Sequence, residues 1–227
     1  MHTLLLLNGG IGSRAAAGHP KQFIEIDGRP MAVYSLIAAD AVEEITQIVF
    51  NYPPGFLEPT QRLVEDYAIR TPVVYVPAGS TRHESVAAML PHAENSSVII
   101  HESARPMIGA DDFENLIEAE ADNVGYMIPI SFTVAPVDPD STLVTGSLDR
   151  DRLRNVQLPQ KFSKEDLLAA HAEAAAKGTQ FTEDATLLAA NGFKVGYIEG
   201  DDKNIKVTTP TDVKLVGFLM GRNTDND

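Results

Sequence analysis

The distribution of apolar and polar positions along the chain predicts alternating strands and helices. Short apolar runs bounded by turn residues are typical of strands buried within a sheet. Between these runs lie segments with helical spacing or helix-start signals. The predicted strands cover residues 4–7, 46–50, 73–76, 97–100, 125–130 and 193–198; the predicted helices cover residues 30–39, 57–68 and 164–176 and begin near residues 81, 182 and 210. This alternation, with short connections, predicts right-handed crossovers and a mostly parallel sheet.

Residues 131–160 break the alternation. They contain two strand-like pieces, Phe132–Val134 and Thr142–Val144, separated by prolines and aspartates and without a helical period. We therefore predict a protruding β-arm over residues 131–155. Further on, residues 205–208 alternate as a strand with buried Ile205 and Val207, so that Lys206 points the other way.

The elements together predict an α/β fold, a Rossmann-like three-layer sandwich around a mostly parallel sheet. We find no internal repeat and no linker, and we predict a single domain over residues 1–222, followed by a flexible tail at residues 223–227.

Composition and charge narrow the functional classes. The chain has 227 residues, of which 44% are hydrophobic, enough for an ordinary core. It contains no cysteine, which excludes disulfides and thiolate metal sites. Its formal net charge of -14 argues against general nucleic-acid binding. No apolar run is long enough to span a membrane or to form a secretory signal, so we expect a cytoplasmic protein with no membrane or nucleic-acid partner.

A glycine-rich segment after the first strand is the strongest candidate for a ligand site. Residues 8–23 read NGGIGSRAAAGHPKQF. Glycines let backbone N–H groups approach a ligand, and Arg14 and Lys21 add two cations. In a parallel sheet, ligands bind beyond the carboxyl ends of the strands. The segment therefore predicts a polyphosphate site; the alternative is a surface loop with solvated cations.

Three phosphate-loop patterns can be compared with this segment. The P-loop pattern is absent. The dinucleotide pattern Gly-x-Gly-x-x-Ala matches residues 10–15, but Gly18 and Pro20 would interrupt the helix that this pattern should open. The nucleotidyltransferase pattern Gly-Gly-x-Gly-x-Arg, followed by Pro-Lys-Gln, accounts for Arg14 and residues 20–22 together.

The loop after the third strand is a second candidate. Thr81 and Glu84 have the spacing of a capping box at a helix start. The functional interpretation places Gly79 and the start of this helix against a nucleotide, with Ser85 facing the base or the ribose. Both interpretations stay open at this point.

The end of the fourth strand is a third candidate. Glu102 follows this strand and stands near Arg105. A carboxylate in this position is a plausible ligand of Mg²⁺, which proteins commonly hold with one or two carboxylates and substrate phosphates. The alternative is a weak surface pair between Glu102 and Arg105. We expect His101 to pack or hydrogen-bond rather than to act in catalysis.

These motifs resemble those of the CTP-dependent cytidylyltransferases that act on polyol phosphates. They occur in the same order as in that family and extend along nearly the whole chain. The group that they fit best is 2-C-methyl-D-erythritol 4-phosphate cytidylyltransferase, with ribitol-5-phosphate cytidylyltransferase as a near relative. The matching segments are residues 9–14 with 20–22, 79–86, 101–106, 149–150, 157–160, 182–185 and 204–208.

The resemblance implies transfer of CMP from CTP to a polyol phosphate, with release of pyrophosphate and with Mg²⁺ as cofactor. The expected acceptor is 2-C-methyl-D-erythritol 4-phosphate, used in isoprenoid precursor synthesis; ribitol 5-phosphate, or a related precursor of wall or capsule polymers, is the alternative. The implied catalytic residues are Arg14, Lys21 and Lys206; the nucleotide-binding residues are Asn8, Gly9, Gly10, Gly12, Gly79, Ser80, Arg82 and Ser85; the acceptor-binding residues are Glu102, Arg105, Thr133, Arg150 and Thr182, with Glu102 also at the metal.

The resemblance also implies a homodimer. In this family the β-arm reaches across to the neighbouring subunit, so that Thr133 and Arg150 would serve the partner's site.

Several positions depart from the family pattern. Asn8 stands where alanine is usual, and Glu102 replaces an aspartate. In the acceptor half, Phe132 replaces an aspartate, Leu158 replaces a threonine, and Ala135 lies in a stretch that lacks the usual basic residues. Two other functional classes follow as alternatives: a non-catalytic nucleotide-binding regulator and a nicotinamide-dependent oxidoreductase.

Overall fold

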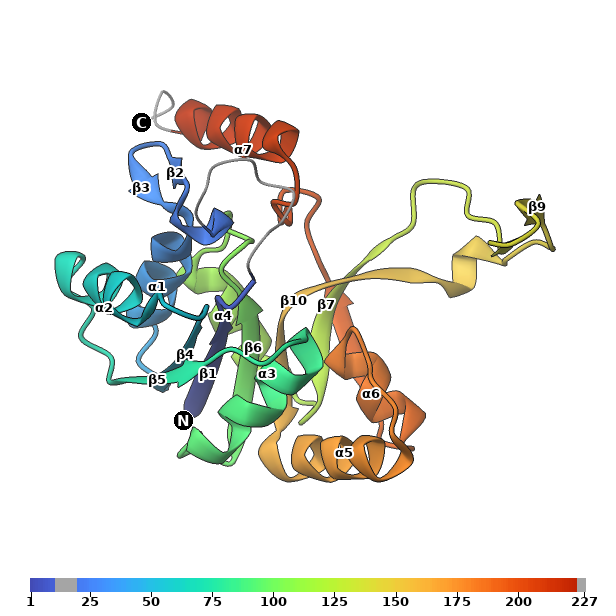
Figure 1. Cartoon of the computed structure of the whole chain (residues 1–227), viewed down its shortest axis with the longest axis horizontal. Helices are drawn as coiled ribbons and strands as arrows, with labels where there is room; N and C mark the ends of the chain where they lie inside the picture. The colour runs from blue at the N-terminus through green and yellow to red at the C-terminus, as the bar shows by residue number, and fades with distance from the viewer. Residues whose placement is uncertain (11–19, 224–227) are drawn as a thin grey trace.

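A seven-stranded sheet forms the centre of the computed structural model, which describes residues 1–10 and 20–223 (Figure 1). Its strands are β1 (His2–Leu7), β4 (Ile45–Tyr52), β5 (Val73–Pro77), β6 (Ser97–Glu102), β7 (Val124–Pro129), β10 (Arg154–Ser163) and β11 (Gly196–Glu199). Their order across the sheet is β11-β7-β10-β6-β1-β4-β5. Strand β10 runs antiparallel to both of its neighbours, and the other pairs are parallel. The predicted mostly parallel sheet is confirmed.

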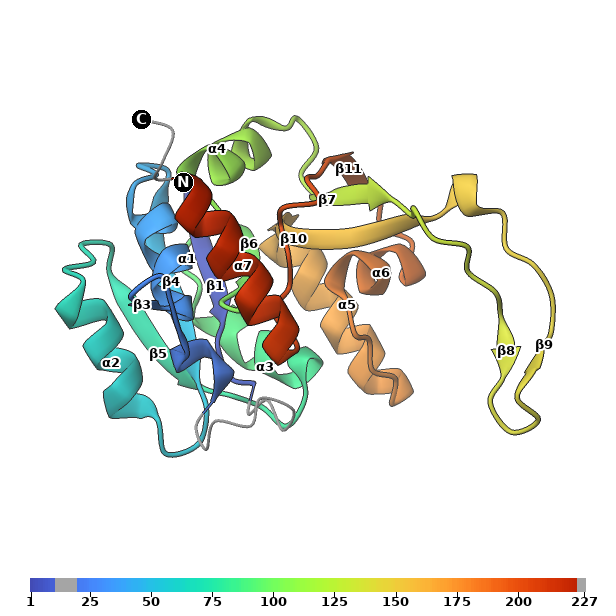
Figure 2. The same ribbon diagram turned by 90° about the horizontal axis from the view of Figure 1, so that it is seen from above.

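Helices cover both faces of the sheet (Figures 1 and 2). In β1, Leu4 and Leu6 face one apolar core, whereas Leu5 and Leu7 face the other, as the period of two in a strand requires. The first core includes α1 (Met31–Asp40), α2 (Leu57–Asp66) and α4 (Ala110–Glu118); the second includes α3 (Arg82–Met89), α5 (Lys164–Lys177) and α6 (Asp184–Ala190). This arrangement is the predicted three-layer sandwich.

Strand β10 was not predicted as part of the main sheet, because its sequence is polar. Gln160 and Lys161 are nevertheless buried. The amine of Lys161 donates to the carbonyl oxygens of Ile117 and Ala119, at 3.0 and 2.6 Å. These carbonyls lie at the end of α4, where a helix has acceptors without intrahelical partners. A lysine can therefore occupy a central strand here because the next helix supplies its hydrogen-bond acceptors.

Helix α4 is also absent from the predicted elements. It starts after Gly109, whose backbone N–H donates to the carboxylate of Asp112 at 2.8 Å. Phe113 and Leu116, three positions apart, bury its apolar side against the sheet. The helix supplies the layer that connects β6 to β7 on one face.

The predicted strand at residues 205–208 is wrong, because this segment pairs with no strand of the described chain. The predicted alternation of its side chains is confirmed. Val207 is buried and Ile205 packs in the same small cluster, while Lys206 is exposed. A single backbone bond, from Val207 N–H to Ala104 O at 2.8 Å, holds the segment against the loop after β6.

Short elements complete the carboxyl side of the sheet. The hairpin of β2 (Glu25–Ile26) and β3 (Arg29–Pro30) contacts the C-terminal helix α7 (Pro210–Asn223). The described residues also form 3₁₀ turns: η1 (Lys21–Phe23), η2 (Leu90–His92), which directly follows α3, and η3 (Arg150–Arg152), which lies between the arm and β10. Within the described residues, no helix combines the length and the apolar character needed to cross a membrane.

The predicted β-arm is confirmed as a protrusion. Between β7 and β10 the chain leaves the sheet and turns back through a hairpin of β8 (Val137–Asp138) and β9 (Leu143–Val144), far from the helices (Figures 1 and 2). The arm is rich in exposed apolar side chains, including Phe132 at 80% exposed. Apolar surface on so thin an extension is a mark of an interaction site.

Candidate active site

A cleft of about 610 Å³ lies where four parallel strands end. Its walls come from the residues that follow β1, β4, β5 and β6, from the start of α3, and from Lys206. The residues that line it are Leu7, Asn8, Gly9, Gly10, Lys21, Gln22, Asn51, Pro54, Ala78, Gly79, Ser80, Thr81, Arg82, Ser85, Glu102, Ser103, Ala104 and Lys206. The cleft therefore occupies the position expected for a ligand site of a parallel sheet.

The cleft brings together many, but not all, of the residues implied by the resemblance. The predicted site residues that line it are Asn8, Gly9, Gly10, Lys21, Gly79, Ser80, Arg82, Ser85, Glu102 and Lys206. Arg105 lies outside this lining and donates to the carbonyl of Asn204 at 2.8 Å. Thr182 is exposed before α6, and Thr133 and Arg150 are exposed on the arm. Gly12 and Arg14 lie outside the residues that the structure describes.

The end of β1 is held closely against its neighbours. The backbone N–H of Asn8 donates to the side-chain oxygen of Asn51, and its carbonyl accepts from the amide of Gln22. At Gly9, a Cβ atom would lie 2.2 Å from the Cβ of Ala78, so this position has no room for a side chain. The glycine thus allows the ends of β1 and β5 to approach each other.

The start of α3 forms the wall beside β5. The hydroxyl of Thr81 accepts from the N–H of Glu84 at 3.1 Å, which is one half of the predicted capping box. The other half differs, because the carboxylate of Glu84 accepts from the N–H of Ser80 at 2.8 Å rather than from Thr81. The hydroxyl of Ser85 accepts from Gly79 N–H at 3.1 Å and donates to Thr81 O at 2.9 Å. Helix and loop are therefore locked together.

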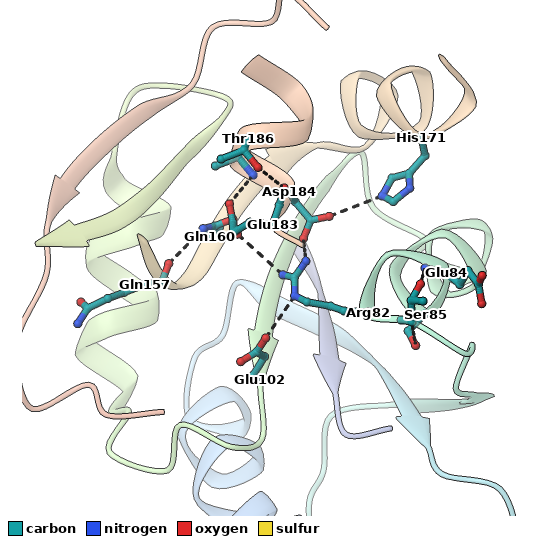
Figure 3. A network of polar contacts seen from close by, with 12 residues as sticks. Arg82, Glu84, Ser85, Glu102, Gln157, Gln160, His171, Glu183, Asp184 and Thr186 are labelled. Atoms are coloured by element: carbon teal, nitrogen blue, oxygen red, sulfur yellow. Dashed lines mark hydrogen bonds and ion pairs between the residues drawn. The ribbon is translucent and has the colours of Figure 1, made fainter. Parts of the chain in front are cut away.

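Arg82, in α3, is the centre of a network with carboxylates from the end of β6 and the start of α6 (Figure 3). Its guanidinium lies 3.2 Å from Glu102, 2.6 Å from Asp184 and 3.9 Å from Glu183, measured between nearest nitrogen and oxygen atoms. Burial alone would lower the pKa of Arg82, but the three carboxylates outweigh burial and raise it. Asp184 also lies 3.6 Å from the ring of His171. The guanidinium therefore stays charged and fixed in place.

Glu102 joins Arg82 to Lys206. One carboxylate oxygen faces Arg82, and the other lies 2.7 Å from the ammonium of Lys206. Burial would raise the pKa of Glu102, but Lys206 and Arg82 outweigh burial and lower it, so the carboxylate is ionised. The alternative of a Glu102–Arg105 surface pair is wrong, because Glu102 is buried and pairs with two other cations.

Lys21 and Lys206 stand near opposite ends of the sequence, and both reach the cleft. The ammonium of Lys21 donates to the carbonyl of Val207 at 2.7 Å, which places it beside the segment that carries Lys206. Both lysines line the cleft. The side of the cleft nearest β6 therefore presents cations in a chain whose net charge is strongly negative, and such a concentration favours an anionic ligand.

The side chains that line the cleft can be compared with the ligands that a metal ion needs. Glu102 is the one carboxylate among the described residues that line the cleft, and the described chain has no cluster of three or more histidine or acidic side chains suited to a metal. A site with one carboxylate fits Mg²⁺ bound mainly through substrate phosphates, and it does not fit a metal held by protein ligands alone.

His101 has the packing role that we predicted. It is fully buried, and burial lowers the pKa of its ring to about 3. The ring packs edge-on against Phe113, and one nitrogen lies 3.3 Å from the carbonyl of Arg105. It is a neutral core residue.

Comparisons with known proteins agree with this geometry. The family model described as IspD, 2-C-methyl-D-erythritol 4-phosphate cytidylyltransferase, matches residues 2–222. The chain belongs to the IspD family.

Individual members of the IspD family align along their whole length. The 2-C-methyl-D-erythritol 4-phosphate cytidylyltransferase of Geobacillus thermodenitrificans is 35% identical over 95% of each chain. That of Bacillus licheniformis is 31% identical over 96% of this chain and 95% of its own. The fold is similar to the crystal structure of 4-diphosphocytidyl-2C-methyl-D-erythritol synthase from Anaerococcus prevotii, with a TM-score of 0.85 and 24% identity over 98% of this chain and 96% of that one.

Some residues of this IspD site were not singled out from the sequence. Asp184 and Glu183 lie in the matching segment 182–185 but were assigned no role, and Asp184 is the closest carboxylate to Arg82. Asn51 directly follows the strand predicted at residues 46–50 and was assigned no role, and it lines the cleft. A polar residue at the carboxyl end of a buried strand was the available signal for Asn51; the contact of Asp184 depends on tertiary structure.

We predict that Gly79→Ala destabilises the protein by about 1–3 kcal/mol, the usual cost of overpacking. The new Cβ would lie 2.6 Å from the Cβ of Glu84 and 2.9 Å from its carbonyl carbon, so that α3 must shift. Chemical denaturation measures the free energy of unfolding. Gly217→Ala, within α7, is the control, since its Cβ would lie 3.9 Å from a side-chain carbon of Ile26, an ordinary contact, and should not destabilise. Equal stability of Gly79→Ala and wild type would contradict the close packing.

Proposed function

We propose that this protein transfers CMP from CTP to 2-C-methyl-D-erythritol 4-phosphate, with release of pyrophosphate, in isoprenoid precursor synthesis. Membership of the IspD family gives the reaction class. The observation that carries the proposal is the ion-paired Lys206, held by Glu102 at the edge of a glycine-lined cleft that Lys21 also enters.

The chemistry needs charge and position more than reactive side chains. An oxygen of the acceptor phosphate attacks the α-phosphorus of CTP, its bond to phosphorus forms, and the bond to the bridging oxygen of pyrophosphate breaks. Negative charge grows on the oxygens of the α-phosphate, where preorganised cations are most effective. Lys206 and Lys21, which both line the cleft, would supply these cations, and Arg14 would join them on the triphosphate. Because the attacking phosphate is already ionised, no general base is required.

Glu102 has two roles in this proposal. Its carboxylate fixes the ammonium of Lys206 before substrate arrives, so little reorganisation is needed during transfer. It is also the residue that would hold Mg²⁺ together with substrate phosphates, since it is the one carboxylate among the described residues of the cleft. When bound, Mg²⁺ would neutralise phosphate charge.

The acceptor side supports a second candidate. Phe132 and Ala135 lie on the arm, and Leu158 is buried in β10; these are the positions where the sequence departs from the expected pattern. Ribitol 5-phosphate, or another polyol phosphate, is therefore the alternative acceptor. Thr133, Arg150, Thr182 and Arg105 stay proposed acceptor contacts.

The experiment is an acceptor panel with CTP and Mg²⁺, with pyrophosphate release as the readout. We expect the highest kcat/KM with 2-C-methyl-D-erythritol 4-phosphate and CTP, and lower values with ribitol 5-phosphate and with ATP or UTP. A preference for ribitol 5-phosphate would replace the acceptor and keep the reaction. Nucleotide binding without pyrophosphate release from any acceptor would favour a regulator.

We predict that Lys206→Ala lowers kcat by about 10²–10³-fold, the usual loss when one preorganised contact to developing charge is removed. Because the contact strengthens in the transition state, the affinity for CTP should fall much less. Arg14→Ala should also weaken CTP binding, since it would hold ground-state phosphates. Steady-state kinetics and calorimetric titration with CTP separate the two effects.

The control for Lys206→Ala is Lys203→Ala, an exposed lysine in the same segment that does not line the cleft. Its kinetics should match those of wild type. A folded Lys206→Ala enzyme with near-normal turnover would remove Lys206 from the mechanism.

We further propose that the arm pairs two subunits, as a homodimer. The arm has little hydrophobic core of its own. Its large exposed apolar side chains include Phe132, Val137, Leu143, Val144 and Leu148. In such a dimer, Thr133 and Arg150 would reach the partner's cleft, which they do not line in their own subunit.

The double substitution Leu143→Glu with Val144→Glu should convert the dimer to a monomer and lower activity, because charged side chains would be buried at the tip of the arm. Light scattering after size exclusion, over a range of protein concentrations, gives the mass. Leu57→Glu, at another exposed leucine on α2, should keep the dimer. A fully active monomeric wild type would rule out this role of the arm.

A further inference from the structure

The segment between β11 and Lys206 belongs to no helix or strand of the described chain. After Lys206, one backbone bond from the N–H of Val207 to the carbonyl of Ala104 fixes the chain. Before Lys206, the segment makes a turn in which the N–H of Asn204 donates to the carbonyl of Asp201 at 3.0 Å. Because no strand ladder supports this segment, the position of the Lys206 ammonium depends on what holds the turn.

Two side-chain hydrogen bonds tie this turn to β10. The side-chain nitrogen of Gln157, which is 4% exposed, donates to the carbonyl of Asp201 at 2.8 Å. In the opposite direction, the side-chain nitrogen of Asn204 donates to the carbonyl of Leu158. Arg105, from the loop after β6, adds its bond to the carbonyl of Asn204. The turn is therefore held at two neighbouring points of one strand and from one further loop.

Strand β10 can make these bonds because its pairing is interrupted here. It pairs with β7 up to Val156 and again from Gln160, with a shift of register between them, and its pairing with β6 begins at Gln160. Residues 157–159 lie outside both pairings, and such an interruption changes the direction of side chains. The side chain of Gln160 donates to the carbonyl of Gln157 at 3.1 Å, which fixes the interrupted stretch (Figure 3).

Gly200 allows Gln157 to reach the turn. A Cβ atom at this position would lie 2.1 Å from the side-chain oxygen of Gln157 and 3.1 Å from a side-chain carbon of Ile128. No other residue type leaves room for so close an approach. The N–H of Gly200 also donates to the carbonyl of Met127 at 3.0 Å, so the start of the segment stays aligned with β7.

We propose that Gln157 and Asn204 are positioning residues for Lys206. They fix the turn that precedes Lys206, while Glu102 holds its ammonium at 2.7 Å. Neither Gln157 nor Asn204 is among the described residues that line the cleft, so both would act through Lys206. A preorganised cation is effective only in the right place, and a displacement of about 1 Å can cost on the order of 10²-fold in rate. The inference rests on the proposed function, because it takes Lys206 as the cation at the α-phosphate.

The test uses two variants. Gln157→Met keeps a side chain of similar length and removes the donor, and Asn204→Ala removes the other bond. Each should lower kcat by about 5–30-fold, more than one lost hydrogen bond alone explains and less than Lys206→Ala. The dissociation constant of CTP, from calorimetric titration, should change by less than about 2-fold, because Lys206 acts mainly in the transition state. Amide hydrogen exchange of residues 201–206 should become faster.

The same substitutions in Lys206→Ala separate positioning from a general structural role. If Gln157 and Asn204 act through Lys206, removing either one should have no further effect on kcat once Lys206 is absent. A general structural role predicts the same fold loss of kcat in both backgrounds.

The matched control is Gln47→Met. Gln47 is also a buried glutamine in a strand, β4, and its side-chain nitrogen likewise donates to a backbone carbonyl, that of His92 at 3.1 Å. Because Gln47 lies near the amino end of its strand, away from the cleft, this variant should melt at a lower temperature and keep the kcat of wild type.

Normal kcat in Gln157→Met and Asn204→Ala would overturn the inference, and so would equal losses with and without Lys206. A lowered kcat without faster exchange of residues 201–206 would also overturn it, because these side chains would then not hold the turn. Failure of wild type to release pyrophosphate from CTP with any acceptor would instead overturn the proposed function.

Discussion

The organisation of the cleft depends on the ion pairs that the carboxylate of Glu102 forms with Arg82 and Lys206. A buried carboxylate is stable only when its charge is compensated, and here two cations from distant parts of the chain do so. Arg82 comes from the helix after β5, and Lys206 comes from the irregular segment before α7. The same carboxylate therefore fixes the positions of both segments relative to the end of β6. Asp184 extends this network to α6 (Figure 3), so that, with the segment of Lys206, four separate parts of the chain meet through charge.

The sequence was sufficient to predict the parts of the fold in which local pattern and tertiary structure agree. Runs such as residues 4–7 are apolar on both faces, and this is the condition of a strand covered by helices on both sides. Strand β10 was missed for the opposite reason. Lys161 is buried in it with hydrogen-bond acceptors on Ile117 and Ala119, which lie far away in the sequence, and no local pattern reveals those partners. The strand predicted at residues 205–208 has the right alternation but no neighbour with which to pair.

In the candidate site, too, some features follow from the local sequence and others depend on contacts between distant residues. The loops that line the cleft could be predicted, because parallel strands place their carboxyl ends at one edge and glycines mark close approach there. The pairing of charges could not. Arg105 is near Glu102 in sequence and was the partner in the alternative interpretation, but Glu102 pairs with Arg82 and Lys206. Which cation reaches a buried carboxylate depends on side-chain directions that only the folded chain establishes.

The position of β10 in the sheet affects how the chain can fold during its synthesis. During synthesis, β1, β4, β5 and β6 can pair as soon as they are available, but the open edge of β6 is covered only by β10, which follows both β7 and the whole arm. An uncovered strand edge can pair with another chain. Closure of the sheet also requires a contact between distant parts of the chain, which slows folding. Until β10 has been synthesised, the edge of β6 has no partner strand within the sheet and is open to pairing with another chain.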